Sequence, residues 1–142
     1  MRAPWHEMYI HVVWSTWNRL PLITSELIPH IHRILAAKCN ALDCPPLAIG
    51  GVEDHIHVFA RFTPTVAVSS LVKEMKGSSS HAITHVIRPG EFFKWQGGYG
   101  AFSVSRRHVE MISAYVLNQV SHHKAGTVYS PLERYGEEGL SD

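Results

Sequence analysis

Residues 55–62 have the sequence HIHVFARF, from which the prediction of the fold starts. Its apolar residues recur at every second position, which is the period of a β-strand whose two faces meet different surroundings. One face carries Ile56, Val58, Ala60 and Phe62, and the other carries His55, His57, Phe59 and Arg61. The preceding PPLAIGGV, residues 45–52, predicts a second strand, and the two strands are expected to form a hairpin.

The segments before this hairpin predict a strand and a helix. MYIHVVW, residues 8–14, is rich in β-branched and aromatic side chains and suits a buried strand. From Leu27 onward the apolar residues recur at spacings of three and four, which predicts an amphipathic helix over residues 25–43. Thr24 or Ser25 is available as its N-cap.

The segments after the hairpin predict two more helices and one more strand. Thr63 and Pro64 are expected to open a helix that weakens at Gly77. A glycine-rich stretch then leads into a strand over residues 101–105, followed by a last helix from about residue 106 to residue 124.

The predicted order is strand, helix, strand, strand, helix, strand, helix. It indicates an α+β, ferredoxin-like (RRM-like) fold, in which helices cover one face of an antiparallel four-stranded sheet. The C-terminal helix, which bears a tyrosine, is added to this unit. Residues 1–142 are predicted to form a single domain, with a loosely ordered tail from about residue 126.

Composition sets only broad limits on function. The formal net charge is +1, so nucleic-acid binding would have to come from local patches. No apolar run reaches the length of a membrane span and no secretory leader is recognisable, so we expect a cytoplasmic protein without a membrane partner. Cys39 and Cys44 are expected to be reduced structural thiols.

Two His-Ile-His triplets occur, and their predicted secondary structure separates them. His30 and His32 fall in a helix, where residues two apart point about 200° away from each other and cannot bind one ion. His55 and His57 fall in a strand, where residues two apart project from the same face. This second pair suits a metal ion, although two half-exposed histidines on an open sheet face would give the same pattern.

The last helix offers a third ligand for such an ion. Tyr115, Gln119 and His122 share one helix face by their spacing of four and seven. A packed aromatic side chain next to an exposed amide would produce the same spacing, so the helix alone leaves both interpretations open.

Taken together, these motifs closely resemble those of a known family. The strand triplet, the stretch WQGGYGAFSVS and the helix YVLNQVSHH, with the opening HVVWSTWNR, resemble the single-tyrosine HUH transposases of small bacterial insertion sequences and their domesticated relatives associated with repetitive palindromes. The resemblance covers residues 9–123. It departs from the family in the short tail after His123 and at Trp17, where relatives often carry a basic residue.

The resemblance implies a metal-dependent cleavage and rejoining of single-stranded DNA. By similarity, Tyr115 is the nucleophile and forms a 5′-phosphotyrosine. His55, His57 and Gln119 would bind a divalent metal, Mg²⁺ or Mn²⁺. The expected partner is single-stranded or hairpin DNA, and relatives of this size imply a homodimer with active sites shared in trans.

Cationic and aromatic side chains are the candidate DNA contacts, because they bind phosphates and stack on bases. They are Arg19, Lys73, Lys76, Trp95, Tyr99, Arg106 and Arg107.

Two other functions remain open on the sequence alone. A histidine-triad nucleotide hydrolase also places alternating histidines on a strand, but its third histidine would fall where this chain has Phe59. A non-catalytic RNA-binding module could use the open face of the same sheet. It would lack the usual K/R-G-F/Y strand signature and leave Tyr115 and Gln119 without a role.

Overall fold

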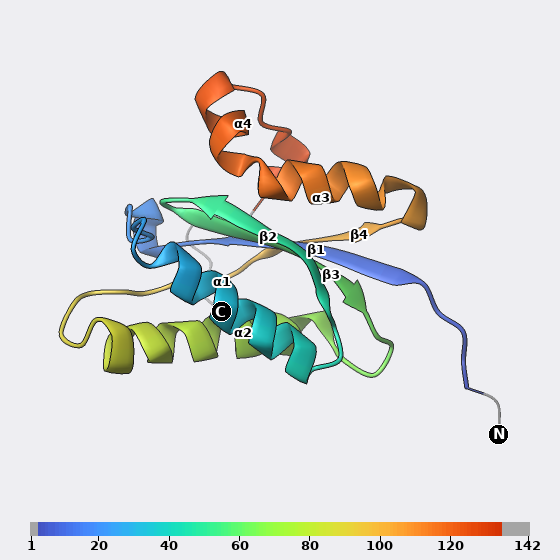
Figure 1. Cartoon of the computed structure of the whole chain (residues 1–142), viewed down its shortest axis with the longest axis horizontal. Helices are drawn as coiled ribbons and strands as arrows, with labels where there is room; N and C mark the ends of the chain where they lie inside the picture. The colour runs from blue at the N-terminus through green and yellow to red at the C-terminus, as the bar shows by residue number, and fades with distance from the viewer. Residues whose placement is uncertain (1–2, 135–142) are drawn as a thin grey trace.

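The computed structural model describes residues 3–134, and a four-stranded antiparallel sheet runs through its centre (Figure 1). The strands lie in the order β2-β3-β1-β4. Their bounds are Met8–Ser15 for β1, Pro46–Val52 for β2, His55–Phe62 for β3 and Gly100–Val104 for β4. This is the ferredoxin-like strand order, and the predicted fold class is confirmed.

Helices α1 and α2 cover one face of the sheet (Figure 1). α1 spans Ile28–Ala41, and α2 spans Val68–Ala82 and continues as the π-helix η2 over Ile83–Ile87. The larger hydrophobic core lies between these helices and the sheet. Its fully buried members include Val12, Trp14, Leu35, Ile56, Val58, Leu71 and Met75.

The C-terminal helices cover the opposite face, which the sequence left open (Figure 1). α3 spans Val109–Leu117 and α4 spans Gln119–Ala125. A smaller core of Ala48, Phe59, Ile112 and Val116 lies beneath α3. An RNA-binding module that uses this face as an open platform is therefore excluded, and Phe59 serves packing.

The contact between α3 and the sheet depends on Gly50 in β2. A Cβ atom at this position would collide with the backbone carbonyl of Val116. The missing side chain lets the backbone of α3 approach the strand closely. The helix that carries Tyr115 therefore lies closer to β2 than a residue with a side chain at position 50 would allow.

Two predicted helix starts were wrong. α1 begins at Ile28 with Leu27 as its N-cap, because the carbonyl of Thr24 closes a separate turn with the N–H groups of Leu27 and Ile28. Thr63 opens a turn instead of a helix: its carbonyl accepts the N–H of Val66, and α2 begins only at Val68.

The serine run after Gly77 does not end α2. The hydroxyls of Ser78 and Ser79 donate to the carbonyls of Glu74 and Met75, each at 2.7 Å, so the polar side chains are satisfied within the helix. The predicted helix over residues 106–124 is instead divided. It starts as the 3₁₀ turn η3, Arg106–His108, and breaks at Asn118 between α3 and α4.

Residues 127–134 follow α4 back toward the sheet and end in the 3₁₀ turn η4, Ser130–Glu133. The rest of the predicted tail lies outside the described residues. Another 3₁₀ turn, η1, covers Trp17–Arg19 after β1. Within residues 3–134, no helix combines the length and apolar character needed to cross a membrane.

Candidate active site

His55 and His57 lie on the face of β3 beneath the C-terminal helices, and both side chains are fully buried. They are therefore more enclosed than the half-exposed pair considered from the sequence. The Nδ1 atom of His55 lies 2.8 Å from Oδ1 of Asp54 in the β2–β3 turn. The Nδ1 atom of His57 lies 2.7 Å from Nε2 of His11 on β1. Both partners turn the Nε2 atoms of His55 and His57 toward one site.

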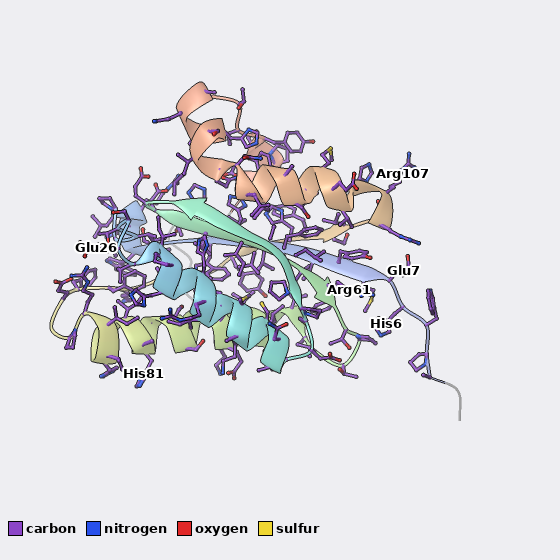
Figure 2. The ribbon with its side chains drawn as sticks, viewed as in Figure 1. His6, Glu7, Glu26, Arg61, His81 and Arg107 are labelled. Atoms are coloured by element: carbon purple, nitrogen blue, oxygen red, sulfur yellow. The ribbon has the colours of Figure 1, made fainter. Side chains whose placement is uncertain are left out.

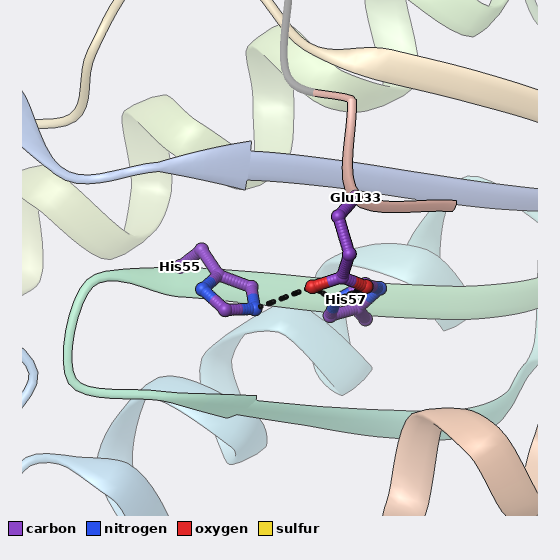
Figure 3. Close-up of side chains that lie close together, drawn as sticks. All are labelled: His55, His57 and Glu133. Atoms are coloured by element: carbon purple, nitrogen blue, oxygen red, sulfur yellow. Dashed lines mark hydrogen bonds and ion pairs between the residues drawn. The ribbon is translucent and has the colours of Figure 1, made fainter. Parts of the chain in front are cut away.

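The carboxylate of Glu133 occupies the space between these two Nε2 atoms (Figure 3). Its Oε1 lies 3.1 Å from Nε2 of His55, and its Oε2 lies 3.0 Å from Nε2 of His57. Glu133 was not among the residues selected from the sequence. It stands in a short segment without periodicity, 76 residues from His57, and no sequence signal connects the two.

Tyr115 reaches the same carboxylate from α3. Its hydroxyl donates a hydrogen bond of 2.8 Å to Oε2 of Glu133 and accepts one of 2.9 Å from the backbone N–H of Tyr129. Its ring stacks on His122 at a centroid distance of 4.8 Å and meets His57 edge-on at 6.0 Å. His122 therefore packs against the tyrosine and does not face the histidine pair.

Gln119, the first residue of α4, is buried at the other side of the site. Its Oε1 lies 3.4 Å from Nε2 of His55 and 3.0 Å from Nε2 of His123. Its Nε2 donates to the backbone carbonyl of Tyr115 at 3.0 Å. The structure thus brings His55, His57, Tyr115 and Gln119 together within one chain.

Burial and hydrogen bonds shift the pKa values of the side chains in this site. Burial opposes a charge on His55, but its hydrogen bonds to Asp54 and Glu133 outweigh burial and raise its pKa to about 9. Burial lowers the pKa of His57 and also that of His11, the latter to about 3. The hydrogen bonds from His55 and His57 hold the pKa of Glu133 well below its usual range despite burial. Glu133 therefore stays ionised among imidazoles.

This donor set fits a divalent cation. Among residues 3–134, ligand atoms of His55, His57 and Glu133 lie within 4.8 Å of one another. Imidazole nitrogens, a carboxylate and a nearby amide oxygen are ligands found around Mn²⁺ and, for the oxygens, Mg²⁺.

Four of the predicted DNA contacts line one groove beside α2, on the other side of the sheet. Lys73, Lys76, Trp95 and Tyr99 border a groove of about 740 Å³, together with Lys94. Trp95 is largely buried, and its Nε1 donates to Ser79 at 2.9 Å. Lys76 donates to the carbonyls of Gln96 and Gly98, so it also holds the glycine-rich loop in place.

The predicted arginines lie elsewhere. Arg19 forms a 3.6 Å ion pair with Asp54 at the edge of the histidine site. Arg106 and Arg107 are exposed where the C-terminal helices begin, and Arg107 points outward there (Figure 2). The candidate DNA contacts are thus distributed over three regions of the surface.

A buried histidine pair lies on a strand, and a helix that carries a tyrosine follows later in the chain. Comparison with known families gives a result that agrees with this arrangement. The model of the IS200-like transposases matches residues 5–119. The chain belongs to this family. It is therefore a transposase, and the enzyme class inferred from the resemblance is confirmed; a histidine-triad hydrolase is set aside.

Two solved structures share the fold of this IS200-like transposase. One is a protein from Deinococcus radiodurans R1 assigned as a transposase, with 22% identity, a TM-score of 0.65 and coverage of 84% of this chain and 95% of that one. The other is a REP-associated tyrosine transposase bound to a REP hairpin, with 14% identity, a TM-score of 0.64 and coverage of 90% and 74%. No curated protein matches the chain at a significant level.

Proposed function

We propose that this IS200-like transposase is a metal-dependent endonuclease and strand transferase acting on single-stranded DNA at hairpin-bearing ends. The observation that carries the proposal is the position of Tyr115. Its hydroxyl lies 2.8 Å from the carboxylate that contacts both His55 and His57. A nucleophile is thereby held beside a cluster of metal-binding groups.

In the proposed reaction, Oη of Tyr115 attacks a backbone phosphorus atom. The new bond joins Tyr115 to phosphorus, and the bond between phosphorus and the 3′-oxygen breaks. The products are a 5′-phosphotyrosine and a free 3′-hydroxyl, and the proton that the tyrosine hydroxyl loses is balanced by the proton that the 3′-oxygen takes up. The covalent bond conserves the energy needed for rejoining, so no nucleotide cofactor is required.

A divalent ion, Mg²⁺ or Mn²⁺, is proposed to be held by His55, His57 and Gln119. When bound, such an ion polarises the scissile phosphate and stabilises the displaced oxygen. The chain itself prepares the ligands: Asp54 and His11 hold the two imidazoles with their Nε2 atoms toward the site. Gln119 directs its amide oxygen to the same place.

The proposed substrate is single-stranded DNA that carries a hairpin. The fold neighbour that is bound to a REP hairpin supports this choice. The groove beside α2 supplies Lys73 and Lys94 for phosphates and the half-buried ring of Tyr99 for a base. Arg19 would extend a phosphate path to the histidine site, while Arg106 and Arg107 mark a separate contact.

The expected homodimer with sites completed in trans stays a prediction based on the resemblance. Within one chain, Tyr115 already lies beside His57, which favours a site built in cis. Sharing in trans would require α3 and α4 to leave this position and dock on the partner subunit.

The test is cleavage of a labelled hairpin oligonucleotide with single-stranded flanks, taken from palindromes beside the gene. Mn²⁺ or Mg²⁺ should give a nicked product and a covalent protein–DNA adduct, and EDTA should prevent both. His55→Ala and His57→Ala should lose the cleavage. Cleavage that continues in EDTA, or an adduct that survives in both variants, would refute the proposed metal site.

A further inference from the structure

We propose that Glu133 is a ligand of the divalent ion, so that the C-terminal segment supplies an anionic group to the metal site. This inference rests on the proposed metal-dependent function. It adds a carboxylate from η4 to the neutral set of His55, His57 and Gln119.

The distances within the cluster match the spacing of ligands around one ion. Donors around Mg²⁺ or Mn²⁺ lie about 2.1 Å from the ion, so two donors at right angles lie about 3 Å apart. Oε1 of Glu133 lies 3.1 Å from Nε2 of His55, and Oε2 lies 3.0 Å from Nε2 of His57. Both oxygens therefore have the spacing of neighbouring ligands with the two imidazoles.

The orientation of the imidazoles supports the same assignment. Because Asp54 and His11 occupy the Nδ1 sides of His55 and His57, the two Nε2 atoms converge on the carboxylate. Among residues 3–134, the other ring nitrogen of His11 has no hydrogen-bond partner, so either tautomer of His11 can face Nδ1 of His57. In the ion-bound chain, His57 would donate from Nδ1 to His11 and use Nε2 as the ligand.

The segment that carries Glu133 is held in place by several contacts. The N–H of Thr127 donates to the carbonyl of His122, and the N–H of Tyr129 donates to the hydroxyl of Tyr115. Leu132 packs against the smaller core. At Gly100 in β4, a Cβ atom would collide with the carbonyl of Arg134, so the chain passes directly over the strand.

An anionic ligand changes which ion the site prefers. Two imidazoles and an amide favour borderline ions such as Ni²⁺, whereas a carboxylate adds affinity for hard ions such as Mg²⁺ and Mn²⁺. Glu133 also accepts the hydrogen bond of Tyr115, so the same carboxylate would position the nucleophile next to the ion. Replacing it should therefore lower the affinity for Mn²⁺ more than that for Ni²⁺.

Calorimetric titration of the full chain with Mn²⁺ and with Ni²⁺ tests the assignment. Glu133→Gln and Glu133→Ala should bind Mn²⁺ at least about tenfold more weakly, with a smaller loss for Ni²⁺. Glu110→Gln, an exposed charge-matched change on α3, should bind both ions like the unaltered protein. Gly100→Ala keeps the carboxylate but displaces Arg134, and it should reproduce part of the Mn²⁺ loss. Circular dichroism checks that each variant is folded.

The outcomes separate this inference from the function on which it rests. Normal Mn²⁺ binding in Glu133→Ala, together with lost binding in His57→Ala, would overturn the role of Glu133 and leave the histidine site intact. Tighter Mn²⁺ binding with faster cleavage in Glu133→Ala would also overturn it, because the carboxylate would then be a plug in the site. Normal binding in His57→Ala would instead refute the proposed metal function.

Discussion

The hydroxyl of Tyr115 and the carboxylate of Glu133 share a hydrogen bond of 2.8 Å. Burial and this negatively charged neighbour raise the pKa of Tyr115 to about 12. The nucleophile is therefore protonated at neutral pH in the resting chain. A cation that offsets the charge of Glu133 would ease ionisation, which links the proposed ion to the reactivity of the tyrosine.

Tyr115→Phe should abolish cleavage and covalent adduct formation while hairpin binding changes less than about threefold. The substitution removes one hydroxyl and little contact area. Adduct formation is measured by a mobility shift on denaturing gels, and binding by fluorescence anisotropy. A Phe variant that still forms the adduct would exclude Tyr115 as the nucleophile.

His11→Ala should weaken Mn²⁺ binding about 10- to 100-fold, the usual range for a residue that orients a metal ligand. It removes the partner that lies 2.7 Å from Nδ1 of His57. His11→Gln keeps a hydrogen-bond acceptor at this position and should recover part of the affinity. Equal Mn²⁺ affinities for all three proteins by titration calorimetry would show that His11 only fills space.

Co-expression of a His57→Ala chain with a Tyr115→Phe chain distinguishes sites in cis from sites in trans. Sharing in trans gives half of the dimers one intact site, so about a quarter of the normal cleavage should return under random pairing. The position of Tyr115 beside His57 in the same chain favours the other result, in which no cleavage returns. Differential tags confirm that heterodimers are present.

Gly50→Ala should destabilise the protein by about 1–3 kcal/mol and reduce cleavage, although residue 50 carries no reacting group. The added methyl group would meet the carbonyl of Val116 and lift α3, with Tyr115, from the sheet. Denaturant unfolding and the cleavage rate measure the two effects. Gly77→Ala is the matched control for unfolding: a Cβ there meets nothing within 4 Å, so it should not lower the free energy of unfolding.

The two cysteine thiols should be unreactive in the native protein at pH 8. Both are buried, and burial raises the pKa of Cys39 to about 12 and also raises that of Cys44. Only the thiolate reacts with a disulfide reagent such as DTNB. Unfolding in guanidinium should release two thiols, and rapid reaction of either one before unfolding would contradict the burial.

The strands were predictable because each is a compact apolar run, and β3 also has a clear period of two. The alternation over residues 55–62 fixed both the strand and the shared face of His55 and His57, and the structure agrees. Helical spacing placed Tyr115 and Gln119 on one face, although the helix breaks at Asn118 between them, and only the family resemblance implied their roles. Helix starts were missed because Thr24 and Thr63 close turns in front of the helices.

Glu133 and His11 show what the sequence could not provide. His11 was read as one residue of a buried strand, and only the pairing of β1 with β3 places it against His57. Glu133 stands in a segment with no regular pattern, and its position depends on contacts with α4, Tyr115 and β4. Contacts between single side chains that are far apart in the sequence do not produce a local sequence pattern.

Because Glu133 lies 76 residues after His57, the residues of the site are synthesised at different times. A growing chain contains His55 and His57 well before it contains Tyr115, and Glu133 leaves the ribosome later still. Closing such a long loop also takes place late in folding, after the local helices have formed. An incomplete chain therefore holds the paired histidines before it holds Tyr115 or Glu133.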